Sequence, residues 1–288
     1  MSYGDNIDRI HSFSLGDFHD FDNCVFRFFV NHHLGKKYEL AEGNPIQTLG
    51  SLLDLAIKKL HQTKAYFQPP EYLQNLVKAA EVSMREDINF RGKNSFYGAQ
   101  LEFLTPEVVE KAKEVFKTYC QKMKGKFKKL VITEISQKPK PFWERQIMGS
   151  QPLKIWGSPD ALEMGEDQVP EIVDYKYFGD TEKGKSNLDM DLMPKVYTLL
   201  CASDLKKAGY FKARFKVRIW NEPENESFYE EFDLNKDLNL ENFFRDKIER
   251  ILRTDQLSFC EKDFCRVCKS PEREKWIKEL QVKGWIKS

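Results

Sequence analysis

The sequence predicts an α/β fold, in which a sheet core is wrapped by helices and the N-terminal region is mainly helical. Two observations predict this class. Through roughly the first 125 residues, apolar side chains recur at helical spacing. After Gly125 the chain changes to short, β-rich segments separated by turn residues, and a helix and further strands follow. This order of elements is typical of a layered α/β core with flanking helices.

The helical part contains four expected helices. The first is supported by Phe18, Phe21 and Val25, which fall on one helical face. The last is expected to begin with Thr105 as its cap and Pro106 in its first turn. The expected helices cover residues 17–34, 46–66, 70–90 and 106–123.

The second half is expected to supply the sheet. The expected strands cover residues 129–135, 141–148, 153–163, 169–177, 211–220 and 227–234, with helices over 188–207, over 238–252 and from about Pro271. We therefore expect a helical N-terminal region (1–125) packed on the core, a core region (126–235), and C-terminal helices with a cysteine cluster (236–288), together forming one compact unit.

Composition limits the class of protein. Hydrophobic residues make up 41% of the 288 residues, enough for a real core, and the formal net charge is +1. A balance this close to neutral gives no overall basic signal for nucleic acid. No stretch approaches the roughly 20 apolar residues that span a bilayer, and the first residues lack a signal-peptide layout. We therefore expect a cytoplasmic protein without a membrane partner, whose six cysteines stay reduced unless they bind metal.

The most informative segment lies between residues 155 and 176. Residues 165–167 are turn material between two strand-like runs, which predicts a β-hairpin. A turn centred near residue 167 places Asp160 opposite Asp174, and side-chain alternation puts Lys176 on the same face. Two carboxylates and an ammonium suit phosphodiester hydrolysis, because Mg²⁺ or Mn²⁺ prefers oxygen ligands and lysine can orient the attacking water. The backbone carbonyl of Tyr175 is a further candidate ligand.

The Asp-x-Lys pattern alone is also compatible with a strand that carries two exposed charges. A second instance, at Asp204 and Lys206, falls in an expected helix and is interpreted as surface. The context favours the catalytic interpretation for the first instance. An apolar run leads directly into Asp174, and a Gly-x-x-Asp segment ending at Asp160 lies one hairpin arm upstream.

With these residues in place, the sequence resembles the PD-(D/E)XK nuclease superfamily, and within it the RecB-like exonucleases that include CRISPR-associated ones. The resemblance rests on Gly157-Ser-Pro-Asp160 and Ile172-Val-Asp174-Tyr-Lys176 and extends roughly from Ser12 to Cys268. It implies a restriction-endonuclease-like, mixed-sheet core in which Asp160 and Asp174 bind metal and Lys176 is catalytic. It also implies a metal-dependent deoxyribonuclease, an exonuclease acting on single-stranded DNA or DNA ends, with protein partners from a repair or CRISPR system.

The resemblance also gives the cysteines a role. Three late cysteines cluster, which in a reducing compartment favours metal ligation over disulfides. Relatives use one early and three late cysteines to hold a 4Fe–4S cluster, which here implies Cys24, Cys260, Cys265 and Cys268. The late spacing departs from the usual pattern, because Cys260 lies upstream of the Cys-x-x-Cys pair. Structural Zn²⁺ on the same four thiolates, or no metal at all, stays open.

Two further motifs match in part. Relatives carry a glycine followed four residues later by a metal-binding histidine, whereas this chain has Gly50 and Asp54. Asp54 is expected either to bind the hard cation in place of that histidine or to be an exposed helical residue. The helix after the lysine strand usually carries Gln and Tyr four residues apart to position DNA. Here Tyr197 is present, and Met193 stands where Gln is expected.

Two other hypotheses compete with the nuclease. A catalytically inactive DNA-binding or scaffold subunit would keep the fold and the cysteine cluster, and the changes at Asp54 and Met193 favour it. A zinc-stabilised interaction protein unrelated to nucleases would leave the grouping of Asp160, Asp174 and Lys176 unexplained.

Overall fold

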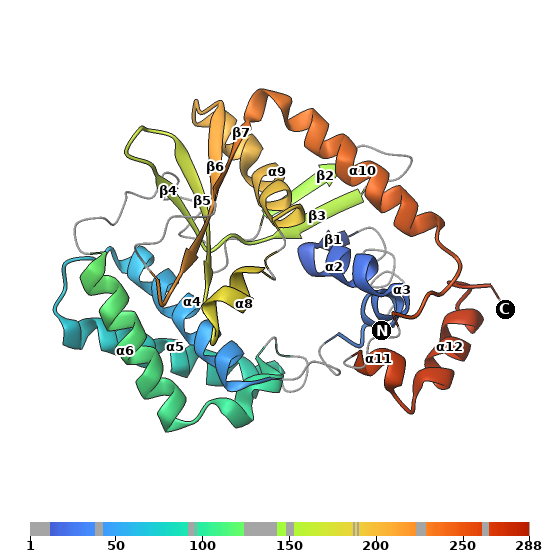
Figure 1. Cartoon of the computed structure of the whole chain (residues 1–288), viewed down its shortest axis with the longest axis horizontal. Coiled ribbons are helices and arrows are strands. Elements are labelled where there is room, and N and C mark those ends of the chain that lie inside the picture. Colours follow the sequence, from blue (N-terminus) through green and yellow to red (C-terminus); the bar gives the residue numbers. More distant parts are fainter. Residues whose placement is uncertain are drawn as a thin grey trace. The chain divides into compact units, whose positions relative to one another are not determined.

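A computed structural model describes residues 12–37, 43–91, 95, 97–123, 143–147, 153–186, 188, 190–222, 229–260 and 265–287. The chain divides into two compact units, each made of segments that are distant in the sequence. The first unit comprises Met1–Ala41, Trp143–Gly157 and Lys236–Ser288, and the second comprises Glu42–Phe142 and Ser158–Asn235. Figure 1 shows the helices and strands of both units.

The second unit is built on a four-stranded sheet in the order β4-β5-β6-β7. β4 (Ala161–Met164) and β5 (Pro170–Lys176) are antiparallel and form a hairpin. β6 (Lys212–Ile219) runs parallel to β5, and β7 (Tyr229–Asp233) is antiparallel to β6. The sheet is therefore mixed, and the predicted α/β class is confirmed.

Helices cover both faces of this sheet. α4 (Pro45–Thr63), α5 (Pro70–Arg91) and α6 (Pro106–Lys122) lie beside one another in Figure 1 and share a core with Val173 and Tyr175 of β5. α9 (Leu192–Lys207) covers the other face, where the Tyr197 ring stacks on Phe215 with 6.0 Å between ring centroids. Since side chains alternate along a strand, neighbouring residues of β5 face different helices. The short helices η3 (Gly98–Phe103) and α8 (Thr181–Ser186) complete this unit, with η4 (Leu234–Lys236) following β7.

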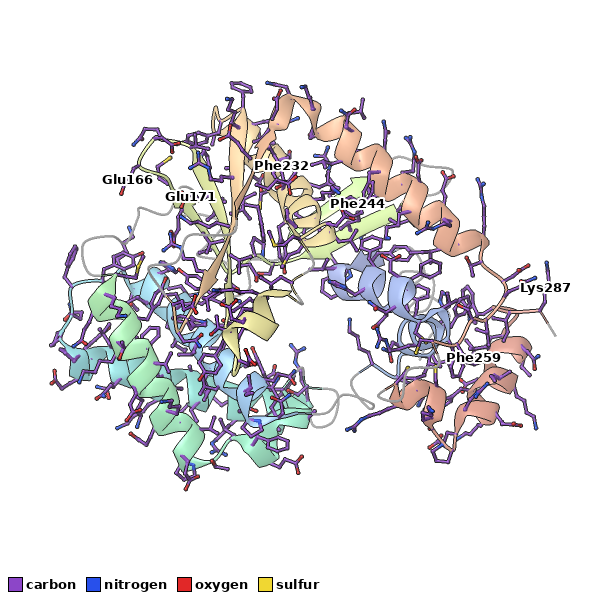
Figure 2. The ribbon with its side chains drawn as sticks, viewed as in Figure 1. Glu166, Glu171, Phe232, Phe244, Phe259 and Lys287 are labelled. Atoms are coloured by element: carbon purple, nitrogen blue, oxygen red, sulfur yellow. The ribbon has the colours of Figure 1, made fainter. Side chains whose placement is uncertain are left out.

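The first unit has a small sheet in the order β1-β3-β2 and an aromatic core. β1 (Ser12–Ser14) is parallel to β3 (Leu153–Gly157), and β2 (Trp143–Ile147) is antiparallel to it. Phe18 packs on Phe244, which Figure 2 labels on α10, with 5.3 Å between ring centroids. The helices are α2 (Leu15–Asn23), α3 (Val25–Phe28), the π-helix η1 (Phe29–His33), α10 (Asp237–Arg253), α11 (Arg266–Lys269) and α12 (Arg273–Val282).

The predicted single helix over residues 17–34 is wrong. Cys24 has an extended backbone (φ −166°, ψ 104°), which separates α2 from α3. Its Sγ accepts the backbone N–H of Arg27 at 3.4 Å and so caps the second helix. Apolar periodicity continues across the break, and for that reason the pattern did not reveal it.

The predicted strand over residues 153–163 is also two elements. β3 ends at Gly157 and belongs to the first unit, whereas β4 begins at Ala161 and belongs to the second. Pro159 lies in the break, and its missing N–H is consistent with an interruption of the ladder there.

The remaining boundaries agree closely with prediction. α4, α5, α6 and α10 lie within three residues of their expected ends, and Thr105 Oγ1 caps α6 by accepting the N–H of Val108. The helix expected from residue 188 begins at Leu192. The strand expected over residues 129–135 lies outside the described residues.

Candidate active site

The β4–β5 hairpin fixes which residues face each other. Ala161 pairs with Val173 and Met164 with Pro170, so Asp160 lies opposite Asp174, as the turn position predicted. The turn is closed by a 2.8 Å hydrogen bond from the N–H of Gly165 to the carbonyl of Val169. A Cβ on Gly165 would lie 2.8 Å from that carbonyl oxygen, so no larger residue fits without a shift. Figure 2 labels Glu166 at the tip of this hairpin.

Asp160 is held by donors on both carboxylate oxygens. The N–H of Tyr175 donates to Oδ2 at 2.9 Å, and Nζ of Lys58 lies 3.1 Å from Oδ1. The backbone continues the hairpin ladder, because the N–H of Asp160 donates to the carbonyl of Val173 at 3.0 Å. The carboxylate is therefore fixed in orientation by β5 and by α4.

Asp174 and Lys176 form an ion pair on the same face of β5. Nζ of Lys176 lies 2.6 Å from Oδ2 of Asp174; the Asp174 side chain is 4% exposed and that of Lys176 is 36% exposed. Burial raises the pKa of Asp174 despite the lowering effect of Lys176, and Asp160 raises it further. Asp174 raises the pKa of Lys176 above its usual value against the opposing effect of burial. The lysine therefore stays charged and open to solvent beside a buried carboxylate.

Asp54 brings a third carboxylate to this group from α4. Its Oδ1 is buried and has no hydrogen-bond partner among the described residues. Burial, followed by the charge of Asp160, raises the pKa of Asp54 well above its ordinary value, and Asp174 adds to that rise. A buried carboxylate oxygen without a donor is costly, and a hard divalent cation would compensate it. The three carboxylates fit Mg²⁺ or Mn²⁺ in this respect.

Tyr197 on α9 borders the same group. Burial and the charge of Asp174 raise the pKa of its hydroxyl well above the usual range, and Lys176 lowers it. The hydroxyl therefore remains a neutral donor near the ion pair. Met193, one turn earlier on the helix, is buried.

The structure adds Lys58, which we did not predict from the sequence. It follows Asp54 by four residues on α4, so both side chains leave the same helical face. That spacing is the sequence signal that points to Lys58. It is a weak signal, because nothing local shows that α4 approaches the hairpin.

A second polar cluster lies on the opposite face of the hairpin. Glu163 is fully buried, and it accepts hydrogen bonds from Nη2 of Arg218 at 2.7 Å and from the Tyr175 hydroxyl at 3.2 Å. His61 also belongs here, with Nε2 3.8 Å from Glu163 and Nδ1 3.1 Å from the Tyr66 hydroxyl. His61 therefore contacts this cluster, on the face of the hairpin away from Asp174.

The first unit brings the four predicted cysteines together. Their Sγ atoms all lie within 4.8 Å of one another, with Cys24 at 3.4 Å and Cys260 at 3.8 Å from Cys268. The four residues come from both ends of the chain: Cys24 caps α3, Cys265 precedes α11 and Cys268 lies within α11. Four thiolates around one tetrahedral zinc ion, with Zn–S bonds of 2.3 Å, are about 3.8 Å apart. The group fits a single ion as it stands, and an iron–sulfur cluster requires the sulfurs to move apart.

Among the described residues, the four cysteines are the group of His, Cys, Asp or Glu side chains whose ligand atoms lie within 4.8 Å of one another. Asp54, Asp160 and Asp174 form a separate group, which offers oxygen ligands in the second unit. Two of these three carboxylates, Asp160 and Asp174, are paired with lysine ammonium groups.

None of the described helices is both long and apolar enough to cross a membrane.

Comparisons with known proteins agree with this geometry at the level of the family. A search of the curated proteins found no match to the chain. Among solved structures, the one titled "Crystal structure of SSO0001" aligns at 14% identity over 65% of this chain and 76% of that chain, with a TM-score of 0.25. A similarity that weak supports no argument about the fold or the site. The model of the PD-(D/E)XK nuclease superfamily matches residues 12–273, which include the β4–β5 hairpin and all four clustered cysteines. The chain therefore belongs to the PD-(D/E)XK nuclease superfamily.

Proposed function

We propose that this protein is a divalent-metal-dependent DNA nuclease whose active site is formed by Asp160, Asp174 and Lys176. The observation that carries the proposal is the hairpin register, which sets the two aspartates opposite each other and Lys176 beside them. The buried, unpartnered Oδ1 of Asp54 next to this group supports a bound cation. Membership of a nuclease superfamily supplies the reaction class.

Asp160 and Asp174 would hold Mg²⁺ or Mn²⁺, with Asp54 and the backbone carbonyl of Tyr175 as further oxygen ligands. When bound, the ion supplies Lewis-acid activation of water and neutralises charge that develops on the phosphate. Asp54 is a harder ligand than the histidine that relatives carry, and this favours Mg²⁺ or Mn²⁺ over softer metals.

Lys176 would orient the attacking water or stabilise the phosphorane-like transition state. Its ammonium is partly exposed and is held 2.6 Å from Asp174, so it stays charged where the scissile phosphate approaches. The Tyr197 hydroxyl, which Asp174 and burial keep protonated, would donate to the DNA backbone or to the lysine. With Met193 in place of glutamine, Tyr197 is the substrate-positioning residue that this helix retains.

The substrate is proposed to be single-stranded DNA or DNA ends, attacked exonucleolytically, as in RecB-like and CRISPR-associated relatives. The protein partners would then belong to a repair or CRISPR system. This finer proposal rests on the resemblance of the motifs quoted above.

The four cysteines would hold a structural metal that joins the N- and C-terminal parts of the first unit. A 4Fe–4S cluster is what the resemblance implies, and Zn²⁺ is what the spacing of the sulfurs accommodates directly. Metal analysis and the visible absorbance of protein purified without oxygen distinguish the two. About four irons per chain with a brown absorbance band indicate the cluster, and one colourless zinc indicates the ion.

The experiment compares linear end-labelled DNA with covalently closed single-stranded circles, using wild type and Asp174→Ala in Mg²⁺, Mn²⁺ or EDTA. The proposal predicts metal-dependent loss of linear DNA, no cutting of circles, and no activity in the variant. Cutting of circles would show endonuclease action and would revise the finer proposal alone. The nuclease proposal fails if wild-type protein, with its cysteine metal intact, cleaves no more DNA than Asp174→Ala does.

The second candidate function is a catalytically inactive DNA-binding subunit. It is favoured by Asp54 and Met193, which replace two residues that active relatives carry. It predicts DNA binding that is unchanged by EDTA and by Asp174→Ala, together with no cleavage.

A further inference from the structure

We infer that Lys58 is a positioning residue of the active site, and that its ammonium takes the place of a second metal ion, so that the site binds one divalent cation. The inference rests on the proposed function and deepens it. Four observations in the second unit support it: a contact, a helical spacing, a charge balance and the pairing of Asp160.

The contact is direct. Nζ of Lys58 lies 3.1 Å from Oδ1 of Asp160, while the backbone N–H of Tyr175 donates to Oδ2. A carboxylate offers about two lone pairs on each oxygen. One site on each Asp160 oxygen is therefore already taken by a donor of the protein itself. Each oxygen keeps about one lone pair for a cation, and the lysine restrains the orientation of the carboxylate.

The helical spacing links Lys58 to the third carboxylate. Lys58 follows Asp54 by one turn of α4, so both side chains leave the same face of the helix. Lys58 is thus an ammonium that shares a helix with Asp54 and pairs with Asp160 of the hairpin. In two-metal nucleases, two cations about 3.5–4 Å apart are bridged by carboxylates. Here a protein cation contacts Asp160 from the helix that carries Asp54.

The charge balance points to one ion. Asp54, Asp160 and Asp174 carry three negative charges when ionised, and Lys58 and Lys176 carry two positive ones. One divalent ion brings this group to +1, which a single phosphodiester neutralises. A second divalent ion would bring it to +3 around that same phosphate, and like charges at close range are strongly unfavourable in a buried site.

The test measures Mn²⁺ binding by calorimetry in wild type, Lys58→Gln, Lys58→Arg and Asp174→Ala, alongside cleavage of single-stranded DNA. We expect wild type to bind one Mn²⁺ that Asp174→Ala does not bind. Removing the Lys58 charge should tighten Mn²⁺ binding roughly tenfold or more, or admit a second ion, because one repulsive positive charge is gone. The same variant should cleave more slowly, because Asp160 is no longer held. Lys58→Arg, which keeps the charge, should restore the wild-type Mn²⁺ affinity.

Lys59→Gln is the matched control, since it removes the adjacent lysine of α4 and should behave as wild type. Lys58→Met gives a second neutral variant of similar length should the glutamine variant fold poorly. Tighter Mn²⁺ binding together with slower cleavage is the combined result that a merely structural role does not produce. The inference is overturned if wild type binds two Mn²⁺, or if a folded neutral variant binds a single Mn²⁺ no more tightly than wild type. The absence of any Mn²⁺ binding or cleavage that depends on Asp174 would instead refute the proposed function.

Discussion

Replacing Glu163 by glutamine should strongly destabilise the protein, although the residue lies on the face of the hairpin away from the active site. Glu163 is fully buried, and Arg218, its partner at 2.7 Å, is 6% exposed. The substitution keeps the shape, but within the described part of the chain it leaves the Arg218 guanidinium in the core with Glu171, 3.6 Å away, as its remaining counter-charge. Breaking a buried ion pair from one side costs roughly 3–5 kcal/mol. Because Glu171 compensates part of the charge, we expect about 3 kcal/mol, which lowers Tm by roughly 6–12 °C for a unit of this size.

The measurement is urea unfolding followed by tryptophan fluorescence, with Glu166→Gln as the control. Glu166 lies at the exposed tip of the same hairpin, so its substitution should change the free energy of unfolding by less than about 0.5 kcal/mol. Adding Arg218→Met to Glu163→Gln should recover part of the loss, because it removes the uncompensated charge. A Glu163→Gln protein as stable as wild type would show that the pair of Glu163 and Arg218 makes no net contribution to stability.

Three further predictions concern the other sites. Burial, with a smaller effect of His32, lowers the pKa of His33 to about 3, whereas the unfolded residue titrates near 6.5. The contribution of His33 to the free energy of unfolding is therefore complete above pH 6.5. It is lost as the pH falls from 6.5 towards 3, and the free energy of unfolding decreases by at most about 1.4 kcal/mol per pH unit. His33→Phe should lack that part of the slope in urea unfolding at pH 7, 6 and 5, and equal slopes would contradict the assignment. Cys265→Ser should abolish the bound metal and lower Tm by as much as chelation lowers it in wild type; a variant that keeps its full metal content would exclude a four-cysteine site. Asp54→Asn should raise the Mg²⁺ concentration needed for half-maximal cleavage by roughly tenfold, because an amide oxygen is a weaker ligand than a carboxylate; an unchanged requirement would remove Asp54 from the metal site.

The local sequence pattern was sufficient for the hairpin that carries the proposed site. The turn position fixed the register, and with it the pairing of Asp160 with Asp174 that the structure confirms. Helices α4, α5 and α6 could also be predicted from local sequence, because each carries apolar residues at helical spacing over several turns.

The local pattern could not predict contacts that depend on how distant elements meet. Lys58 lies more than 100 residues before Asp160, and only the packing of α4 brings the two together. The buried pair of Glu163 and Arg218 is hidden for the same reason, since charged strand residues are usually exposed. The break at Cys24 interrupts an apolar run whose periodicity is that of one helix. The pattern does not reveal the break, since the Cys24 sulfur caps the second helix by accepting the N–H of Arg27.

A direct test of metal-dependent catalysis at Asp174 is the initial rate of Mg²⁺-dependent cleavage of end-labelled single-stranded DNA by wild type, Asp174→Asn and Asp167→Asn. Asp167 lies in the same hairpin but is about half exposed and pairs with Arg214 at the tip, so its variant controls for the fold. We predict wild-type cleavage with Asp167→Asn, a loss of roughly a hundredfold or more with Asp174→Asn, and no cleavage in EDTA. Cleavage by Asp174→Asn at the wild-type rate, or wild-type cleavage that persists in EDTA, would contradict this prediction.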